Sequence, residues 1–222
     1  GYDGEGTVVA VIDSGLRYTH EAFADHGLSE APAITAEDTA AFLAAGGTQG
    51  RYISSRIPFA YDYYGGDDDV WTEDSHGTHI AALAAGYARD EDGAVRFRGA
   101  APAAQILAMK VFPDNSGSGA DDSDILRAME DAWTLGADVI NLSLGSDSGF
   151  TADGALGGAY AAAFQALREA GVILCCAAGN AGYATYGKLQ GAALPTAAYT
   201  DYGTLASPAS YRGTVAVAAA GP

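Results

Sequence analysis

Strand-like apolar segments recur along this chain at intervals that leave room for a helix between them. Most are rich in β-branched residues, and they span 8–12, 106–112, 138–145, 172–178 and 214–219. Two of the intervals, 123–133 and 156–167, show the three-and-four spacing of an amphipathic helix. Strands and helices alternating in this order predict an α/β fold, a doubly wound parallel sheet with helices on both faces. No linker interrupts the pattern, so we expect residues 1–222 to form a single domain.

The charge balance narrows the classes of partner. The 222 residues include 28 acidic and 11 basic side chains, giving a formal net charge of −17, which argues against nucleic-acid binding. No run of 18 apolar residues is present, so no segment is predicted to span a membrane. The chain also begins without a signal-peptide pattern, as expected of a mature or trimmed domain. These properties suit a secreted or surface-exposed protein.

Three polar residues stand where apolar segments end or begin, each near a glycine. Asp13 closes the first strand-like segment, Asn180 follows the fourth, and His76 lies between them in sequence. In open α/β sheets the functional crevice lies at the carboxyl ends of the strands. An acid there can orient a histidine, and an amide there can donate a hydrogen bond to an oxyanion. The combination predicts a general base with its orienting acid and an oxyanion donor.

The histidine at 76 stands at the start of a predicted helix. The apolar face of that helix is predicted to consist of Ile80, Leu83, Ala84 and Tyr87. A histidine fixed in a first helical turn can hold its ring in one orientation, as a general base must. Taken alone, such a residue is more often a cap or a core histidine. The acid at position 13 and the amide at position 180 favour the catalytic interpretation.

An acidic cluster lies directly before this histidine, and it consists of Asp67, Asp68, Asp69, Glu73 and Asp74. Such a cluster can form a hard-cation site or a solvated loop. The spacing matches no calcium-binding loop, so we interpret it as a solvated loop. The charged, glycine-containing segment 89–99 is also predicted to be a loop. By contrast, the alternating bulky residues of 52–63 predict a strand.

The two cysteines, Cys175 and Cys176, are neighbours within a predicted strand. Adjacent strand residues point to opposite faces, which argues against a disulfide between them. We expect both to be small buried hydrophobic residues rather than catalytic thiols.

Several of these segments resemble the motifs of one enzyme family. Residues 9–15 read V-A-V-I-D-S-G, residues 76–81 read H-G-T-H-I-A, and residues 177–180 read A-A-G-N. They resemble the Asp, His and oxyanion-Asn motifs of the subtilisin-like serine proteases, the peptidase S8 family, and the similarity covers nearly the whole chain. The subgroup that it resembles most is the cell-envelope proteinases of Gram-positive bacteria, of the lactocepin and C5a-peptidase type. The features that indicate this subgroup are the spacing from Asp13 to His76 and the segments 60–63, 194–195 and 201–203.

This resemblance implies roles for particular residues. Asp13 would orient the imidazole, His76 would be the base, and Asn180 would supply one donor of the oxyanion hole. The residues implied to flank the substrate are Ser143, Leu144, Gly145, Ala177, Ala178 and Gly179. The implied activity is that of a serine endopeptidase, secreted or on the cell surface, acting on protein or peptide substrates. The chemistry requires no cofactor or metal; family members often carry calcium, for which no site is located here.

The family's nucleophile has no counterpart in the sequence. The family places it in a G-T-S-x-A segment, whereas no Gly-Thr pair in this sequence is followed by serine. The resemblance therefore implies an N-terminal portion of the catalytic domain, truncated before the nucleophile segment and inactive alone. In the subgroup, a protease-associated domain precedes the serine. One alternative is a catalytically inactive module with a binding or adhesion role. A nucleotide-binding enzyme is disfavoured because neither G-x-G-x-x-G nor a Walker A loop is present.

Overall fold

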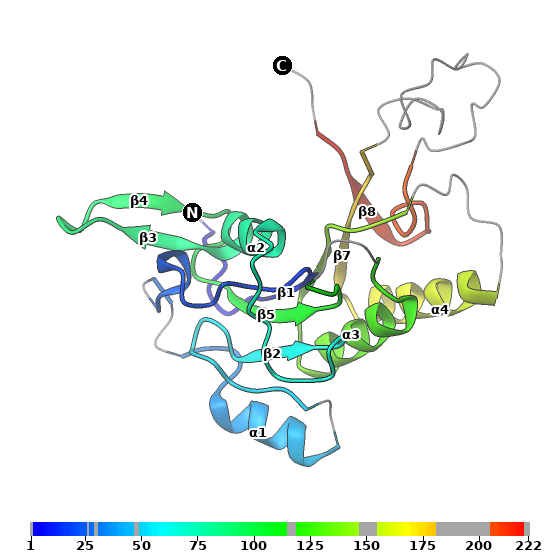
Figure 1. Cartoon of the computed structure of the whole chain (residues 1–222), viewed down its shortest axis with the longest axis horizontal. Coiled ribbons are helices and arrows are strands. Elements are labelled where there is room, and N and C mark those ends of the chain that lie inside the picture. The colour runs from blue at the N-terminus through cyan, green and yellow to red at the C-terminus, as the bar shows by residue number, and fades with distance from the viewer. Residues whose placement is uncertain are drawn as a thin grey trace. The chain divides into compact units, whose positions relative to one another are not determined.

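The computed structural model describes residues 2–25, 27–28, 31–46, 49–114, 119–146, 155–180 and 205–219. They belong to two compact units, Gly1–Ile140 and Asn141–Pro222, which are described in turn (Figure 1). The segments 194–195 and 201–203, which contribute to the family resemblance, lie outside the described residues.

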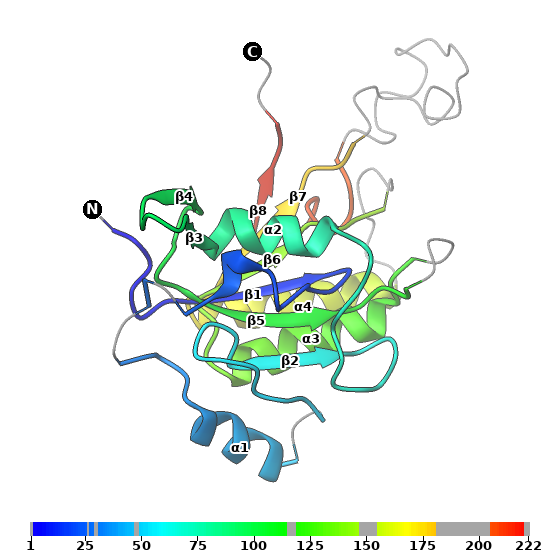
Figure 2. The same ribbon diagram turned by 60° about the vertical axis from the view of Figure 1, so that its left-hand side comes forward.

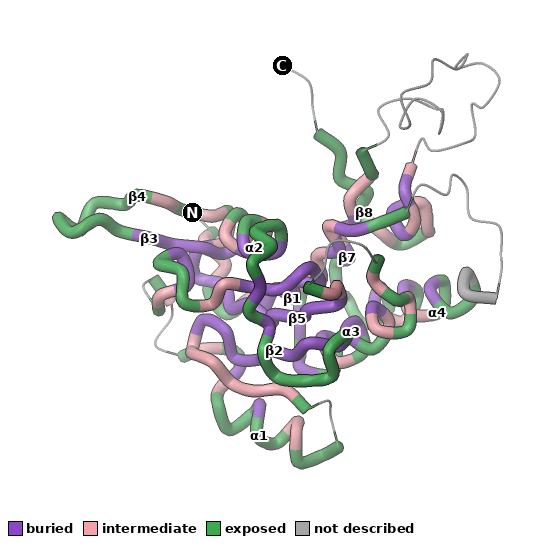
Figure 3. The backbone as a smooth tube through the Cα atoms, viewed as in Figure 1, coloured by how far each residue is buried: buried purple, intermediate pink, exposed green. Residues whose placement is uncertain are grey.

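Three parallel strands form the centre of the first unit. They are β1 (Val8–Asp13), β2 (Phe59–Asp62) and β5 (Gln105–Lys110), in the order β2-β5-β1. Every residue of the three strands is buried, which requires that both faces of the sheet be covered (Figure 3). The register pairs Lys110 with both Asp13 and Asp62, so two acidic residues end their strands at the same edge.

Two helices supply that cover. Helix α2 (His76–Ala85) and helix α3 (Asp122–Thr134) both pack on β1, and Figure 2 shows them on opposite faces of the strands. Helix α3 ends before Gly136, which adopts a positive φ of 87° that a side chain would disfavour. The predicted α/β class, with a parallel sheet between helices, is confirmed.

The buried face of α2 agrees only in part with the predicted one. Ala81 and Ala85 are fully buried, whereas Leu83 is 48% exposed. The helix turns its smallest residues toward the sheet because they let its backbone approach β1 closely. Ile80 and Ala84 are half-buried and pack against the core, so apolar periodicity identified the helix and part of its buried face, while Leu83 was wrongly included.

Two sequence-based predictions of local structure were wrong. The segment 89–99, predicted to be a loop, contains strand β4 (Val95–Arg98) and the last residue of β3 (Tyr87–Arg89), and the two strands form an antiparallel hairpin. Its turn is closed by hydrogen bonds between Asp90 and Ala94, so backbone pairing rather than an apolar pattern defines it. The strand predicted over 52–63 is limited to β2. Among the remaining elements, the short helix η1 spans Glu21–Phe23, and α1 spans Ala36–Ala44.

The second unit contains a parallel strand pair and one long helix. Strand β6 (Val139–Leu142) crosses the boundary between the units, and α4 (Ala155–Glu169), β7 (Ile173–Ala177) and β8 (Thr214–Val217) follow. The rings of Tyr160, Phe164 and Tyr211 pack together, with centroids 5.4–5.9 Å apart. This aromatic cluster joins α4 to the segment that leads into β8.

One face of the β7–β8 pair is apolar and open to solvent. Ile173, Val215 and Val217 are each at least 50% exposed. The register aligns Cys175 with Val215 and Ala177 with Val217. Residues on one face of a strand alternate, so Ile173, Cys175 and Ala177 lie on the same face as these two valines. None of the helices in the described ranges is long and apolar enough to cross a bilayer.

Candidate active site

Asp13 and His76, 63 residues apart in sequence, are in direct contact. Asp13 ends β1, His76 begins α2, and the distance from His76 Nδ1 to Asp13 Oδ1 is 2.7 Å. The carboxylate side chain is 1% exposed, while the imidazole is 54% exposed. A buried acid thus holds one ring nitrogen of a histidine that solvent can reach. With Nδ1–H donating to an ionised Asp13, Nε2 is the nitrogen left to accept a proton.

The two oxygens of Asp13 have different surroundings. Oδ1 accepts hydrogen bonds from His76 and from the backbone N–H of Ser14, the latter at 2.7 Å. Oδ2 is buried without a hydrogen-bond partner. Burial raises the pKa of Asp13 above its ordinary value, although His76 and Ser14 both act to lower it. The hydrogen bonds from His76 and Ser14 therefore offset only part of the free-energy cost of removing the Asp13 carboxylate from water.

The first turn of α2 is fixed to the end of β1 by side-chain hydrogen bonds. The N–H of Gly77 donates to Ser14 Oγ at 3.1 Å, and the N–H of Arg17 donates to Thr78 Oγ1 at 3.0 Å. A side chain at position 77 would overlap with the carbonyl oxygen of Gly15, so glycine permits this close approach. Together these contacts set the position from which His76 reaches Asp13.

Arg17 also holds the loop that leads into α2. Its Nε donates to the carbonyl oxygen of Thr72 at 3.1 Å, and its guanidinium also donates to the carbonyl oxygen of Glu73. The same guanidinium lies 5.9 Å from the ring centroid of Trp71. The sequence analysis did not identify Ser14, Arg17 or Thr78. Only the adjacency of Ser14 to Asp13, and of Thr78 to the histidine motif, offered a signal.

The carboxylates of the acidic cluster before α2 accept hydrogen bonds in turns or pair with basic side chains at the surface. Asp67 and Asp69 each accept a backbone N–H two residues ahead, and Asp74 accepts the N–H of His76 at 2.8 Å. Arg51 lies 3.6 Å from the carboxylate of Asp69. Within the described ranges, no group of three or more His, Cys, Asp or Glu side chains is arranged to hold a metal ion.

The segments predicted to flank the substrate all lie in the second unit. Gly145 and Gly179 both lie against Ala206, and Ser207 pairs with Ser146 through two backbone hydrogen bonds of 2.9 Å. The backbone around Ser143, Leu144 and Gly145 is therefore joined to that around Ala177, Ala178 and Gly179 through residues 206–207. The sequence analysis did not identify these two connecting residues. Asn180 follows this segment and is exposed.

Cys175 is half-buried and Cys176 is buried, and both are free thiols. Burial raises the pKa of Cys175, and it raises the pKa of Cys176 to about 12. At neutral pH both are thus protonated and poor nucleophiles, since the thiolate is the reactive form.

Comparison with known proteins identifies the family to which the chain is similar. The profile of the Subtilase family matches residues 4–221. The chain is 37% identical over 226 residues to the PIII-type proteinase of Lactococcus lactis subsp. cremoris (strain SK11), covering 99% of this chain and 11% of the relative. It is 34% identical over 221 residues to the C5a peptidase of Streptococcus pyogenes serotype M3 (strain SSI-1), covering 99% of this chain and 18% of the relative. The chain spans less than a fifth of either relative, and the predicted subgroup is confirmed.

Solved structures agree on the fold. The patellamide maturation protease PatA aligns with a TM-score of 0.58 at 22% identity, covering 99% of this chain and 58% of that chain. A lanthipeptide protease aligns with a TM-score of 0.58 at 21% identity, covering 97% of this chain and 49% of that chain. At such identities the likeness supports the sheet architecture alone.

Proposed function

This chain belongs to the subtilase family of proteases, and from that membership we propose that it carries the acid and the base of a serine endopeptidase. The observation that carries the proposal is the 2.7 Å contact between Asp13 Oδ1 and His76 Nδ1. A buried acid that fixes one nitrogen of an accessible imidazole is the arrangement that a serine hydroxyl requires for activation.

The mechanism follows from the two ring nitrogens. His76 Nε2 takes the proton of a serine hydroxyl as its oxygen attacks the scissile carbonyl, and then gives that proton to the leaving amine. Water hydrolyses the resulting ester by the same route. Asp13 holds the ring and stabilises the imidazolium, and the amide of Asn180 donates to the oxyanion. This chemistry uses no metal or cofactor.

We place the serine in a part of the parent protein beyond these 222 residues, because no G-T-S-x-A segment occurs among them. The much greater length of the relatives supports this assignment. The substrate is a protein or peptide chain flanked by segments 143–145 and 177–179. We also propose a secreted or cell-surface location, as the resemblance to the cell-envelope proteinases implies.

The experiment treats the parent protein with a fluorophosphonate probe and with a mixed peptide library. We expect labelling and hydrolysis, both lost in His76→Ala. Both should be retained in Asp68→Asn, a control substitution in the exposed loop before α2. Residues 1–222 alone should show neither activity. Labelling of that shorter chain, abolished by His76→Ala, would place the nucleophile within it. An unreactive parent protein would instead favour the catalytically inactive binding or adhesion module.

A further inference from the structure

Segment 70–74, which leads into α2, lies along the residues that follow β1. The N–H of Leu16 donates to the carbonyl oxygen of Val70 at 2.8 Å. Next along the chain, Nε of Arg17 donates to the carbonyl oxygen of Thr72 at 3.1 Å. Val70 and Thr72 are both buried. One backbone and one side-chain hydrogen bond therefore join this segment to the chain just after β1.

The same segment caps the start of α2. Thr72 Oγ1 accepts the N–H of Asp74 at 3.1 Å, and Asp74 Oδ1 accepts the N–H of His76 at 2.8 Å. Ser75, at the N-cap position, makes no side-chain hydrogen bond to the helix. The Asp74 carboxylate therefore satisfies an N–H of the first turn that has no partner within the helix. A displacement of Thr72 would be passed through Asp74 to the backbone of His76.

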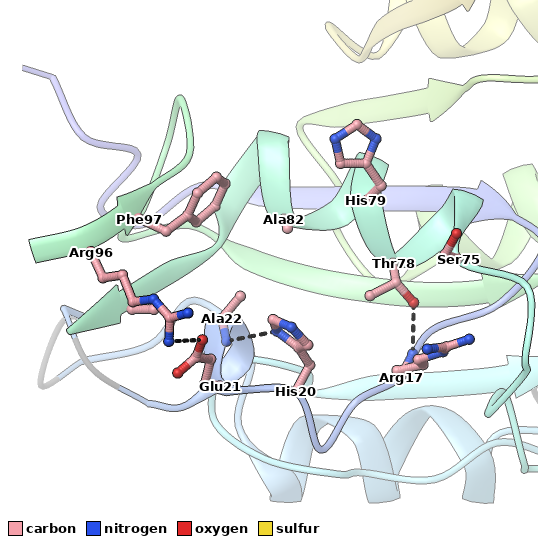
Figure 4. A pocket seen from close by; sticks show the side chains of 11 residues that line it. Arg17, His20, Glu21, Ala22, Ser75, Thr78, His79, Ala82, Arg96 and Phe97 are labelled. Carbon is pink, nitrogen blue, oxygen red and sulfur yellow. Dashed lines mark hydrogen bonds and ion pairs between the residues drawn. The ribbon is translucent and has the colours of Figure 1, made fainter. Parts of the chain in front are cut away.

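Arg17 contacts the chain on both sides of His76. Before the histidine, its guanidinium donates to the carbonyl oxygens of Thr72 and Glu73. After the histidine, the N–H of Arg17 donates to Thr78 Oγ1 at 3.0 Å, a contact that Figure 4 shows. One residue thus connects the segment before α2 to the first turn of the helix.

The shape of the arginine side chain matters more here than its charge. The Glu73 carboxylate, 3.4 Å from the guanidinium, belongs to a side chain that is 87% exposed, so this ion pair contributes little. The two carbonyl oxygens are instead reached by different nitrogens of the planar guanidinium, Nε and a terminal nitrogen. A lysine at position 17 would keep the charge but would present a single nitrogen.

We propose that Arg17 is a positioning residue for the pair of Asp13 and His76. Its guanidinium holds segment 70–74 against the chain after β1, which keeps His76 Nδ1 at its distance of 2.7 Å from Asp13 Oδ1. Loss of these contacts slows the step in which the imidazole takes a proton, because a catalytic group displaced by about 1 Å can lose about 100-fold in rate. The inference rests on the proposed function for the reaction whose rate is measured.

The experiment follows fluorophosphonate labelling of the parent protein and determines both the rate constant and the final stoichiometry. We expect Arg17→Gln to reach the stoichiometry of the wild type with a rate constant about 10- to 100-fold lower. A merely structural role would lower the stoichiometry and leave the rate constant of the remaining sites unchanged. Arg17→Lys should recover only part of the rate, because one ammonium group cannot replace both side-chain contacts.

Arg51→Gln is the matched control. The side chain of Arg51 is 37% exposed, against 36% for Arg17, and it also pairs with an acid, Asp69, and lies over an aromatic ring, that of Tyr18. Because this pair lies outside segment 70–74, the rate constant should stay unchanged. Equal reductions in Arg17→Gln and Arg51→Gln would overturn the proposal. So would a wild-type rate constant in Arg17→Gln or Arg17→Lys, or a reduced stoichiometry at an unchanged rate constant.

Hydrogen exchange separates failure of this inference from failure of the proposed function. In the parent protein, the amides of residues 74–79 should exchange faster in Arg17→Gln than in the wild type, whereas those of the buried strand β5 should exchange equally in both. This comparison requires no catalysis. A wild-type protein that takes up no probe would therefore refute the protease assignment alone, and unchanged exchange of residues 74–79 would refute the role of Arg17 even in an active enzyme.

Discussion

Replacing Asp13 by Asn should make the chain more stable, although Asp13 is assigned to catalysis. The native carboxylate is 1% exposed, and its Oδ2 has no hydrogen-bond partner. Burial raises its pKa, which means that the native state favours the neutral form relative to the unfolded state. An asparagine keeps the acceptor for Ser14 and His76 while removing the buried charge.

The magnitude follows from the uncompensated oxygen. An unsatisfied buried polar group costs about 1–3 kcal/mol, and more when it is charged. The asparagine side chain places an unpartnered NH₂ group near the Oδ2 position, and its burial cancels part of the stabilisation gained by removing the charge. We expect a net stabilisation of about 1 kcal/mol at pH 7, equivalent to about 2–4 °C in Tm for a chain of this size.

The raised pKa also determines how the stability difference between the variant and the wild type changes with pH. Because the folded pKa lies above the ordinary value near 3.8, native Asp13 takes up a proton before the unfolded chain does as the pH falls. The wild type gains stability through that window, so the advantage of Asp13→Asn should shrink on acidification toward pH 4. Thermal melts followed by circular dichroism between pH 4 and 8 measure both quantities.

Asp38 is the matched control of opposite sign. Its carboxylate accepts hydrogen bonds from the hydroxyl and the N–H of Thr35, which lower its pKa. Its ionised form therefore stabilises the fold above pH 3.8, and that contribution is lost as the pH falls through the lowered pKa. Asp38→Asn should reduce Tm at pH 7. A lower Tm for Asp13→Asn at pH 7, or a gap that widens on acidification, would refute the reasoning.

One further substitution probes the region of Asp13 and His76, and one labelling reaction probes the second unit. Gly77→Ala should reduce activity of the parent protein at least tenfold, because the new methyl group overlaps the Gly15 carbonyl oxygen and displaces His76 from its acid; unchanged activity would contradict this. With excess maleimide at pH 7, Cys175 should react faster than Cys176, whose pKa is raised to about 12, and peptide mapping of the adducts would reveal the reverse order.

Much of the framework could be predicted because each of its signals is local. A buried parallel strand is a run of apolar residues, so β1, β5 and β7 were recognisable. The contact of Asp13 with His76 was also predictable in outline, since an acid at a strand's carboxyl end and a histidine at a helix start occupy the same edge of such a fold.

Features that depend on distant partners could not be predicted. Arg56 is fully buried, where its guanidinium donates to the carbonyl oxygens of Ala85, Pro102 and Ala104. Burial lowers its pKa, yet nothing in its sequence neighbourhood marks it as internal. The same holds for Ala81 and Ala85 of α2, which are fully buried although alanine is a weak hydrophobic signal in a sequence.

The open apolar face of β7 and β8 affects the colloidal behaviour of the chain. Ile173, Val215 and Val217 form a patch of branched side chains through which two copies can attract each other. A net charge of −17 opposes that attraction through repulsion between whole molecules, and added salt screens the repulsion. We therefore expect self-association through this strand pair to increase with ionic strength, because salt screens the charge repulsion that opposes it.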